Sequence, residues 1–144
     1  MKDRRSGFSF IEILVVVAII SILATTVGVS VYHWIGKANV AKARDQIGRF
    51  KVALEMYHAE QGVYPSQAQG LASLCREPTV PPQPKNYPQG GYLDSLEVPL
   101  DPWGNDYVFT LPGPGGKPFE ILSYGRDGEP GGTGEDADVS SLDL

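Results

Sequence analysis

The sequence has few of the residues from which most catalytic and metal centres are built. Among 144 residues there is one Cys, which excludes an internal disulfide framework and a Cys-based zinc site. The two His, at positions 33 and 58, are not at a ligand-like spacing, which argues against a His-centred site. No Ser/His/Asp order and no Gly-rich phosphate loop before a helix is recognisable. The sequence therefore predicts a protein that is not an enzyme.

Basic patches and early prolines are also missing. The net charge is −5, with 12 Lys and Arg against 17 Asp and Glu, so the sequence predicts no nucleic-acid partner, because binding needs bases that neutralise phosphates. All 12 Pro lie at or beyond Pro65, and so do most of the 17 Gly. The first half of the chain can therefore form a long helix, whereas the second half is rich in turns.

The longest stretch without charge lies near the N-terminus. From Ile13 to Gly36 there is no Asp, Glu, Lys or Arg, and as a helix this stretch would measure about 36 Å. A bilayer core of roughly 30 Å needs about 20 apolar residues, so the segment is predicted to span a membrane once. Lys2, Arg4 and Arg5 precede it and predict a cytoplasmic N-terminus. A secretory signal peptide is the alternative, but its apolar region is typically shorter.

Glu12 is a carboxylate inside this apolar region. An unpaired acid in lipid costs several kcal/mol, so intramembrane acids usually have a partner. The sequence offers no cation one helical turn away on the same face. Cleavage after Gly7 would create one, the new α-amino group of Phe8, on a neighbouring molecule. A Glu at the membrane interface, without a special role, is the other interpretation.

The segment from Gly7 to Val16, GFSFIEILVV, resembles the class III signal of type IV pilins and pseudopilins. In that family a prepilin peptidase cuts after the Gly and methylates the new N-terminal Phe, and the Glu pairs with that amine of a neighbouring subunit. The resemblance implies a leader peptide at residues 1–7, a cleavage site at Gly7 and Phe8, and an assembly role for Phe8 and Glu12. Phe10 replaces the commoner Leu and is equally apolar.

The helical pattern continues beyond the apolar run. An apolar stripe at 3-4 spacing is typical of a helix packed on a sheet, and it comprises Val40, Ala43, Ile47, Phe50, Leu54 and Tyr57. Gln61-Gly62 predicts the end of the helix, and Pro65 follows as a stop. The sequence therefore predicts one helix from about Phe8 to about Gln61, half in a membrane and half in a domain.

The remainder of the chain predicts little regular structure. A short helix is expected near Leu71, and five prolines between 78 and 88 forbid helix or strand there. Two strands are expected, at 106–110 and 119–124, as an antiparallel hairpin. The expected fold class is α+β and pilin-like: a long N-terminal helix packed on a small antiparallel sheet.

Three later segments narrow the resemblance. Residues 62–71, the run DPWGNDY at 101–107 and the Gly- and Asp-rich stretch 123–139 resemble the major pseudopilin (G subunit) family of type II secretion systems. The resemblance covers nearly the whole chain. It implies residues 8–36 as the transmembrane and assembly half of the helix, and 37–144 as a periplasmic domain anchored in the bacterial inner membrane.

The same resemblance implies a function and partners. The chain is expected to polymerise with itself into a periplasmic filament that drives export of folded proteins across the outer membrane. Expected partners are minor pseudopilins, the prepilin peptidase, the inner-membrane secretion platform and, before assembly, membrane lipid. A minor pseudopilin or type IV pilin subunit, a membrane-anchored periplasmic calcium-binding module and a tethered hydrolase are the alternatives.

Three local features have plainer interpretations. Asp101-Pro102-Trp103-Gly104-Asn105 predicts a packed turn with Trp103 as a core anchor, in preference to a ligand site. Cys75 has no recognisable partner and is expected to be a small buried residue or an inert thiol. His58 is assigned no role.

The C-terminal segment carries six acids and neither Lys nor Arg from Asp127 onward. A disordered acidic tail is one interpretation of this composition. A calcium loop is the other, since Ca²⁺ takes carboxylate and carbonyl oxygens and Gly lets the backbone wrap round it. The spacing itself is a weak signal, and it does not fit an EF-hand. The resemblance, to a loop that binds calcium, implies structural Ca²⁺ within 124–139, held by Asp127, Asp138, Asp136, the carbonyl of Tyr124 and, less clearly, Glu135.

Overall fold

The computed structural model describes residues 8–144, and within its long helix it describes the backbone but not the side chains of residues 25–33. The chain divides into two compact units, Met1–Gly36 and Lys37–Leu144. Each unit is described by itself below.

One helix, α1 (Phe10–Gln61), runs through 52 residues without interruption. This confirms the predicted long helix, and the absence of proline before residue 65 is the reason it can continue so far. It ends where Gly62 adopts a φ of 77°, a left-handed conformation that glycine takes without steric cost. The Gly62 N–H then donates to the carbonyl of His58 at 2.8 Å, which closes the last turn.

The first unit consists mainly of apolar side chains without cover. The side chains of residues 8–24 are exposed, and Phe10 and Ile22 keep 83% and 66% of their surface. In the part of the chain that the structure describes, no helical stretch combines the length and the hydropathy needed to cross a membrane. The predicted membrane half also includes residues 25–33, whose side chains lie outside the described residues.

The second unit contains a three-stranded antiparallel sheet in the order β1-β2-β3. The strands are β1 (Val108–Thr110), β2 (Glu120–Ser123) and β3 (Val139–Ser140). Phe109 pairs with Ile121, and Ser123 pairs with Val139. The predicted hairpin is confirmed, although both strands are shorter than the predicted 106–110 and 119–124. Strand β3 was not predicted.

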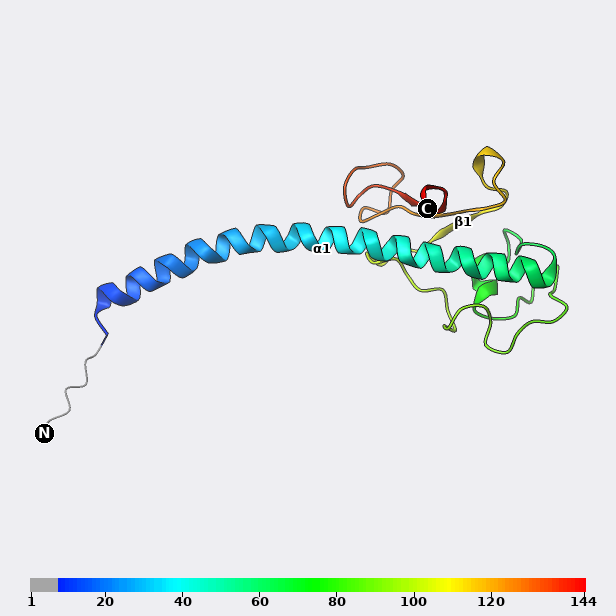
Figure 1. Ribbon diagram of the computed structural model, residues 1–144, viewed down its shortest axis with the longest axis horizontal. Coiled ribbons are helices and arrows are strands. Elements are labelled where there is room, and N and C mark those ends of the chain that lie inside the picture. Colours follow the sequence, from blue (N-terminus) through cyan, green and yellow to red (C-terminus); the bar gives the residue numbers. More distant parts are fainter. Residues whose placement is uncertain (1–7) are drawn as a thin grey trace, which may run out of the picture. The chain divides into compact units, whose positions relative to one another are not determined.

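The second half of α1 packs against this sheet (Figure 1). Five residues of the predicted stripe are at most 1% exposed, and only Val40, at its edge, is partly buried: the five are Ala43, Ile47, Phe50, Leu54 and Tyr57. From the sheet and its flank, Ile121, Phe109 and Phe119 complete the core. Because these apolar faces leave water together, the helix stripe forms one wall of a core that the short strands could not build alone.

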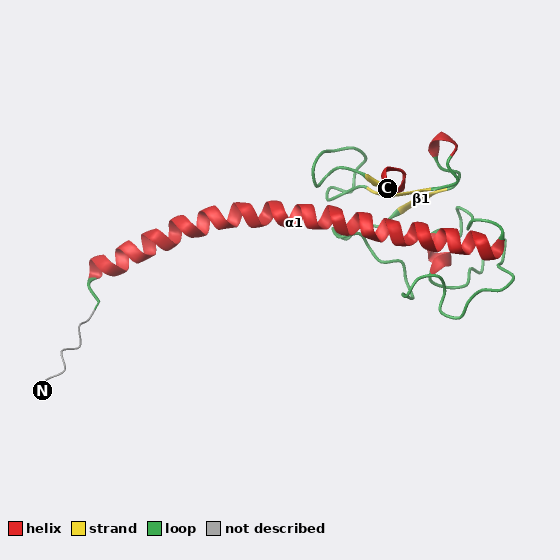
Figure 2. Cartoon of the chain, in the orientation of Figure 1, coloured by secondary structure: helices red, strands yellow, loops and turns green. Residues whose placement is uncertain are grey.

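The chain between α1 and β1 is almost entirely loop, apart from the 3-10 turn η1 (Leu71–Leu74) (Figure 2). Side chains hold it in place. The Gln69 amide donates to the carbonyls of Val80 and Pro82 at 2.8 and 2.7 Å. The Tyr92 ring lies 5.2 Å from that of Tyr57 on α1. Two more 3-10 turns, η2 (Pro114–Gly116) and η3 (Ser141–Asp143), lie in the hairpin loop and at the C-terminus.

Candidate functional site

Glu12 lies in the first turn of α1, next to the predicted cleavage site. The Ser9 N–H donates to Glu12 Oε2 at 3.4 Å, and the Ser9 carbonyl accepts the Glu12 N–H at 3.0 Å. This Ser-x-x-Glu pattern is one half of a capping box, which supplies an acceptor to a donor that a helix start leaves unsatisfied. This local role of Glu12 was not among the sequence predictions, although the spacing of Ser9 and Glu12 signals it.

The geometry also bears on the predicted assembly pair. Phe8 is 79% exposed and directly precedes the capped Ser9, so the start of the predicted mature chain lies beside the Glu12 turn. Gly7, the other residue of the predicted cleavage site, lies outside the described residues. A carboxylate at a helix N-terminus is favoured by the helix dipole, which makes a charged Glu12 compatible with the capping role.

The DPWGN segment is a tightly hydrogen-bonded turn, as predicted. The Asp101 carboxylate is buried, and its Oδ1 accepts the N–H groups of Trp103 and Asn105 at 3.0 and 2.8 Å. The Asp101 N–H donates to the Asn105 carbonyl at 2.9 Å. Trp103 packs on the core, and its buried indole N–H has no hydrogen-bond partner within the described residues.

This turn also contacts the start of the C-terminal loop, a contact that the sequence does not predict. The Ser123 hydroxyl, at the end of β2, donates to Asp101 Oδ2 at 2.6 Å. The Asn105 side-chain amide donates to the Gly125 carbonyl at 2.9 Å. The Gly125 N–H in turn donates to the Ser123 hydroxyl at 3.3 Å. Two side-chain hydrogen bonds therefore join the turn to the first residues of the loop, one through Asp101 and one through Asn105.

The C-terminal loop has an outgoing arm, residues 125–128, and a returning arm, residues 135–137. Arg126 joins the two arms. The Arg126 N–H donates to the Glu135 carbonyl at 2.9 Å, and its guanidinium binds both carboxylate oxygens of Asp136 at 2.9 and 3.0 Å. This hydrogen-bonded carboxylate raises the pKa of Arg126. Asp136, implied by the resemblance as a calcium ligand, is thus bound to an internal cation in this chain.

The other predicted ligands bind backbone groups. Asp127 Oδ1 accepts the Glu129 N–H at 3.2 Å, and both oxygens of Asp138 accept the Gly131 N–H at 3.0 Å. Among the described residues there is no group of three or more His, Cys, Asp or Glu placed to hold a metal ion. The loop therefore brings Asp136 to Arg126 and Asp138 to Gly131, and it does not gather the three predicted acids around one point.

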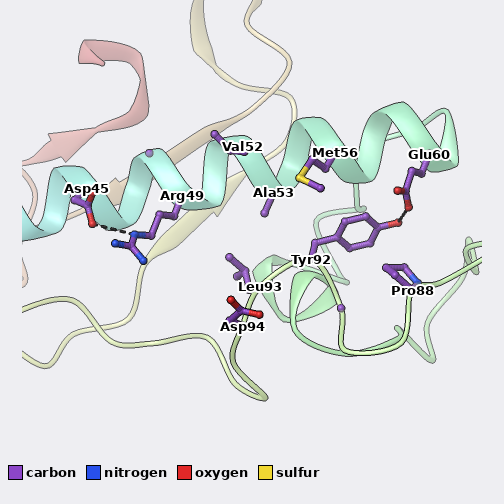
Figure 3. A pocket seen from close by; sticks show the side chains of 12 residues that line it. Asp45, Arg49, Val52, Ala53, Met56, Glu60, Pro88, Tyr92, Leu93 and Asp94 are labelled. Atoms are coloured by element: carbon purple, nitrogen blue, oxygen red, sulfur yellow. Dashed lines mark hydrogen bonds and ion pairs between the residues drawn. The ribbon is translucent and has the colours of Figure 1, made fainter.

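A surface groove runs between α1 and the segment 88–94 (Figure 3). Val52 and Met56 present apolar surface to it, Arg49 binds Asp45 at 3.0 Å beside it, and the Tyr92 hydroxyl donates to Glu60 at 2.8 Å. The lining that the structure describes contains no Ser, Cys or His, and its polar groups are three acids, Arg49 and the Tyr92 hydroxyl. Elsewhere Cys75 is buried, and His58 stacks on the Tyr64 ring at 4.3 Å.

Comparison with known families and relatives agrees with the resemblance. The model of the family described as type II secretion system (T2SS), protein G, matches residues 30–142, and that of the prokaryotic N-terminal methylation motif matches residues 2–28. The chain is similar to the type II secretion system core protein G of Pseudomonas aeruginosa, with 45% identity over 99% of this chain and 98% of the relative. The type II secretion system core protein G of Vibrio cholerae is 40% identical, over 98% of this chain and 94% of the relative.

A solved structure is similar as well, and it confirms the predicted α+β, pilin-like fold. It is the crystal structure of the major pseudopilin from the type 2 secretion system of enterohaemorrhagic Escherichia coli. The TM-score is 0.63 at 36% identity, and the match covers 75% of this chain and 90% of that chain. On these grounds the chain belongs to the type II secretion system protein G family, the major pseudopilins.

Proposed function

We propose that this chain is a structural subunit, not an enzyme, that is cleaved after Gly7 and polymerises through its N-terminal helix into a type II secretion pseudopilus. The observation that carries the proposal concerns the start of the helix, where the apolar side chains of residues 8–24 are exposed around one capped acid, Glu12. Contiguous apolar surface of this extent marks a site of protein or membrane interaction. A match to the N-terminal methylation motif over residues 2–28 supports processing at this end.

Before assembly, the subunit is anchored in the inner membrane by residues 8–36, with its second unit in the periplasm. The basic residues ahead of the apolar run support this orientation, because cytoplasmic flanks carry an excess of Lys and Arg. Its partners are copies of itself, minor pseudopilins, the prepilin peptidase and the inner-membrane secretion platform. The growing filament drives folded proteins across the outer membrane.

Within this function, the C-terminal loop binds a structural Ca²⁺. Asp127 and Asp138 fit such a role, because each accepts only backbone N–H groups in the described contacts and forms no ion pair there. Gly125, Gly128 and Gly131 have positive φ angles that bend the loop backbone, and Ca²⁺ takes backbone carbonyl oxygens as well as carboxylates. Asp136 fits less well than the resemblance implies, since Arg126 holds both of its oxygens.

Intact mass measurement tests the processing step. The chain is expressed in a host with a prepilin peptidase, and the membrane fraction is analysed. We expect a mature chain that begins at N-methylated Phe8, whereas a bulky residue in place of Gly7 should leave the precursor uncut. A wild-type chain that keeps residues 1–7 in that host would contradict the proposal and favour a permanently anchored module.

Calorimetric titration with Ca²⁺ tests the loop separately. The processed, metal-free chain in detergent should bind Ca²⁺ and melt at a higher temperature with the ion, since a ligand that binds only the folded state stabilises it. The Asp127→Ala chain should lose most of this response and still be cleaved after Gly7. Equal melting temperatures of the wild-type chain in EDTA and in millimolar Ca²⁺ would show that the loop is not a calcium site.

A further inference from the structure

We propose that Asn105 is a positioning residue that sets the spacing of the two arms of the C-terminal loop, and thereby the cation affinity of that loop. The metal-dependent part of this proposal rests on the calcium site proposed above. The part that concerns loop geometry does not, because every contact that carries it exists without an ion.

The turn from which Asn105 projects is fixed to the end of β2. The Asp101 carboxylate is 5% exposed and accepts three hydrogen bonds, two from backbone N–H groups of its own turn and one from the Ser123 hydroxyl at 2.6 Å. Hydrogen bonds to an ionised acceptor are short and strong, and a buried carboxylate needs them. One of the two backbone donors is Asn105 itself, so the position of its Cα is determined by Asp101.

The Asn105 side chain then holds a single peptide unit of the loop. Its Nδ2 donates to the Gly125 carbonyl at 2.9 Å. The N–H of that same peptide unit belongs to Arg126, and it donates to the Glu135 carbonyl at 2.9 Å. Because a peptide unit is planar, fixing its carbonyl also aims its N–H. The 125–126 peptide therefore links the turn on one side to the returning arm on the other.

Close packing leaves this peptide little room to shift. A Cβ added to Gly125 would lie 2.7 Å from the Glu135 carbonyl oxygen and 2.9 Å from that of Ala137, so the Gly125 backbone lies directly against the returning arm. The same construction at Gly128 would place a Cβ 3.4 Å from Asn105 Oδ1. The Asn105 side chain thus donates to the loop before Asp127, at Gly125, and leaves little space beside it after Asp127, at Gly128.

The predicted ligands lie on the segments that these contacts position. Tyr124 and Asp127 flank the 125–126 peptide, and Asp138 follows the returning arm that faces Gly125. Asn105 contributes to this arrangement as a donor, through its Nδ2 to the Gly125 carbonyl. Groups that orient metal ligands typically change affinity by 10–100-fold when they are removed.

The test compares three variants of the full processed chain in detergent with the wild type. In Asn105→Ala the donor is absent, and in Asn105→Asp an acceptor of the same shape replaces it. Asn86→Ala is the matched control, an exposed Asn in the loop between α1 and β1. Two measurements are made: the Kd for Ca²⁺ by calorimetry, and amide hydrogen exchange of residues 124–138 in EDTA, with Ile121 as the core reference.

We expect a Kd for Ca²⁺ roughly ten-fold or more weaker in Asn105→Ala, and faster exchange at the Arg126 amide in EDTA. Asn105→Asp should weaken binding as well, because a carboxylate cannot donate to the Gly125 carbonyl. If Asn105 were instead a ligand, the added negative charge of Asn105→Asp would preserve or tighten binding, which contradicts the proposal. Asn86→Ala should match the wild type in both measurements.

Wild-type Kd and unchanged loop exchange in both Asn105 variants would overturn the proposal. Protection of Ile121 shows whether a variant has kept its core, and faster exchange everywhere would indicate general unfolding and count against a positioning role. If the wild-type chain binds no Ca²⁺, the calcium proposal fails. The exchange of the Arg126 amide in EDTA still decides whether Asn105 orders the loop.

Discussion

At the scale of single residues, Glu12 meets two physical demands at once. Its carboxylate accepts the Ser9 N–H, which a helix start would otherwise leave unsatisfied, and it places a negative charge beside the start of the predicted mature chain. An amide can satisfy the first demand, since Gln also occurs at this position of a capping box, but it cannot supply the charge. Substitution by Gln therefore separates the two roles.

We expect Glu12→Gln to be cleaved after Gly7 and to reach the membrane in normal amount, but not to form filaments, because the Phe8 amine of a neighbour would lack its counter-charge. Filament yield by electron microscopy and secretion of a reporter substrate measure this. Glu12→Ala, which also removes the cap, is the comparison. Normal filaments in Glu12→Gln and none in Glu12→Ala would show that capping is the function of Glu12.

Arg126 is a second residue with a consequence of its own, since its guanidinium supplies a cation inside the acidic loop. We expect Arg126→Ala to speed amide exchange at residues 125–138 in EDTA. The reason is that Asp136, on the returning arm, then loses both hydrogen bonds from the guanidinium. Saturating Ca²⁺ should remove most of that difference, as the ion would draw the arms together. The control is Arg49→Ala, which removes an exposed ion pair on α1 and should leave the loop unchanged. Equal exchange in wild type and Arg126→Ala would show that the ion pair does not order the loop.

At the scale of elements, the second half of α1 stabilises the domain through one stripe. Ile47 is fully buried against the sheet, whereas Val52, five residues on, is 61% exposed. A buried Ile→Ala change loses transfer free energy and leaves a cavity, which together cost about 2–5 kcal/mol. A change at an exposed position usually costs within about 0.5 kcal/mol.

The corresponding prediction compares Ile47→Ala with Val52→Ala in urea unfolding of the detergent-solubilised chain. Ile47→Ala should lower the free energy of unfolding by about 2–5 kcal/mol and Val52→Ala by much less. Near-ultraviolet circular dichroism follows the loss of aromatic packing, such as the edge-on contact of Phe50 with Tyr107 at 5.0 Å. Similar losses in both variants would contradict the assignment of the core to this face.

Two tyrosines that pack between the elements have pKa values above the ordinary value of a phenol. Burial raises the pKa of Tyr87 to about 12, and burial together with the nearby Asp101 raises the pKa of Tyr107. An unfolded Tyr ionises near pH 10. The folded state thus favours the neutral phenols, so their contribution is fully present below about pH 10 and is lost as the pH rises toward 12.

We therefore expect the urea midpoint to hold between pH 8 and 9 and to fall from about pH 10 upward. Tyr87→Phe should be less stable at pH 8, because its hydroxyl donates to the Ser73 carbonyl at 3.0 Å, but it should lose less between pH 10 and 12. The measurement is the urea midpoint of both chains across this range in EDTA. Parallel curves would mean that Tyr87 does not carry the alkaline response.

At the scale of the whole molecule, what could be predicted depends on how far apart the interacting residues lie in sequence. The long helix and its buried stripe were predictable because their signals, missing prolines and 3-4 spacing, are local. The hairpin of β1 and β2 was predictable for the same reason. Strand β3 was not, since two residues, Val139 and Ser140, carry no strand pattern and pair only because the loop returns to β2.

The candidate site divides in the same way. The turn at 101–105 was predictable from Pro, Gly and Asp chemistry, but its bond from Asn105 to Gly125 spans 20 positions and has no local signal. The pairing of Arg126 with Asp136 depends on how the loop folds back, so the resemblance alone placed Asp136 among the metal ligands. The calcium site and the membrane span stay predictions.

The shortness of the two outer strands lowers the tendency of the domain to aggregate through its sheet. Both edges of the sheet, β1 and β3, are only 3 and 2 residues long. Long exposed edges recruit further strands and seed amyloid-like aggregation, and short ones offer too few free N–H and C=O groups to do so. The sheet of this domain therefore has little tendency to pair edge to edge with the sheet of another copy.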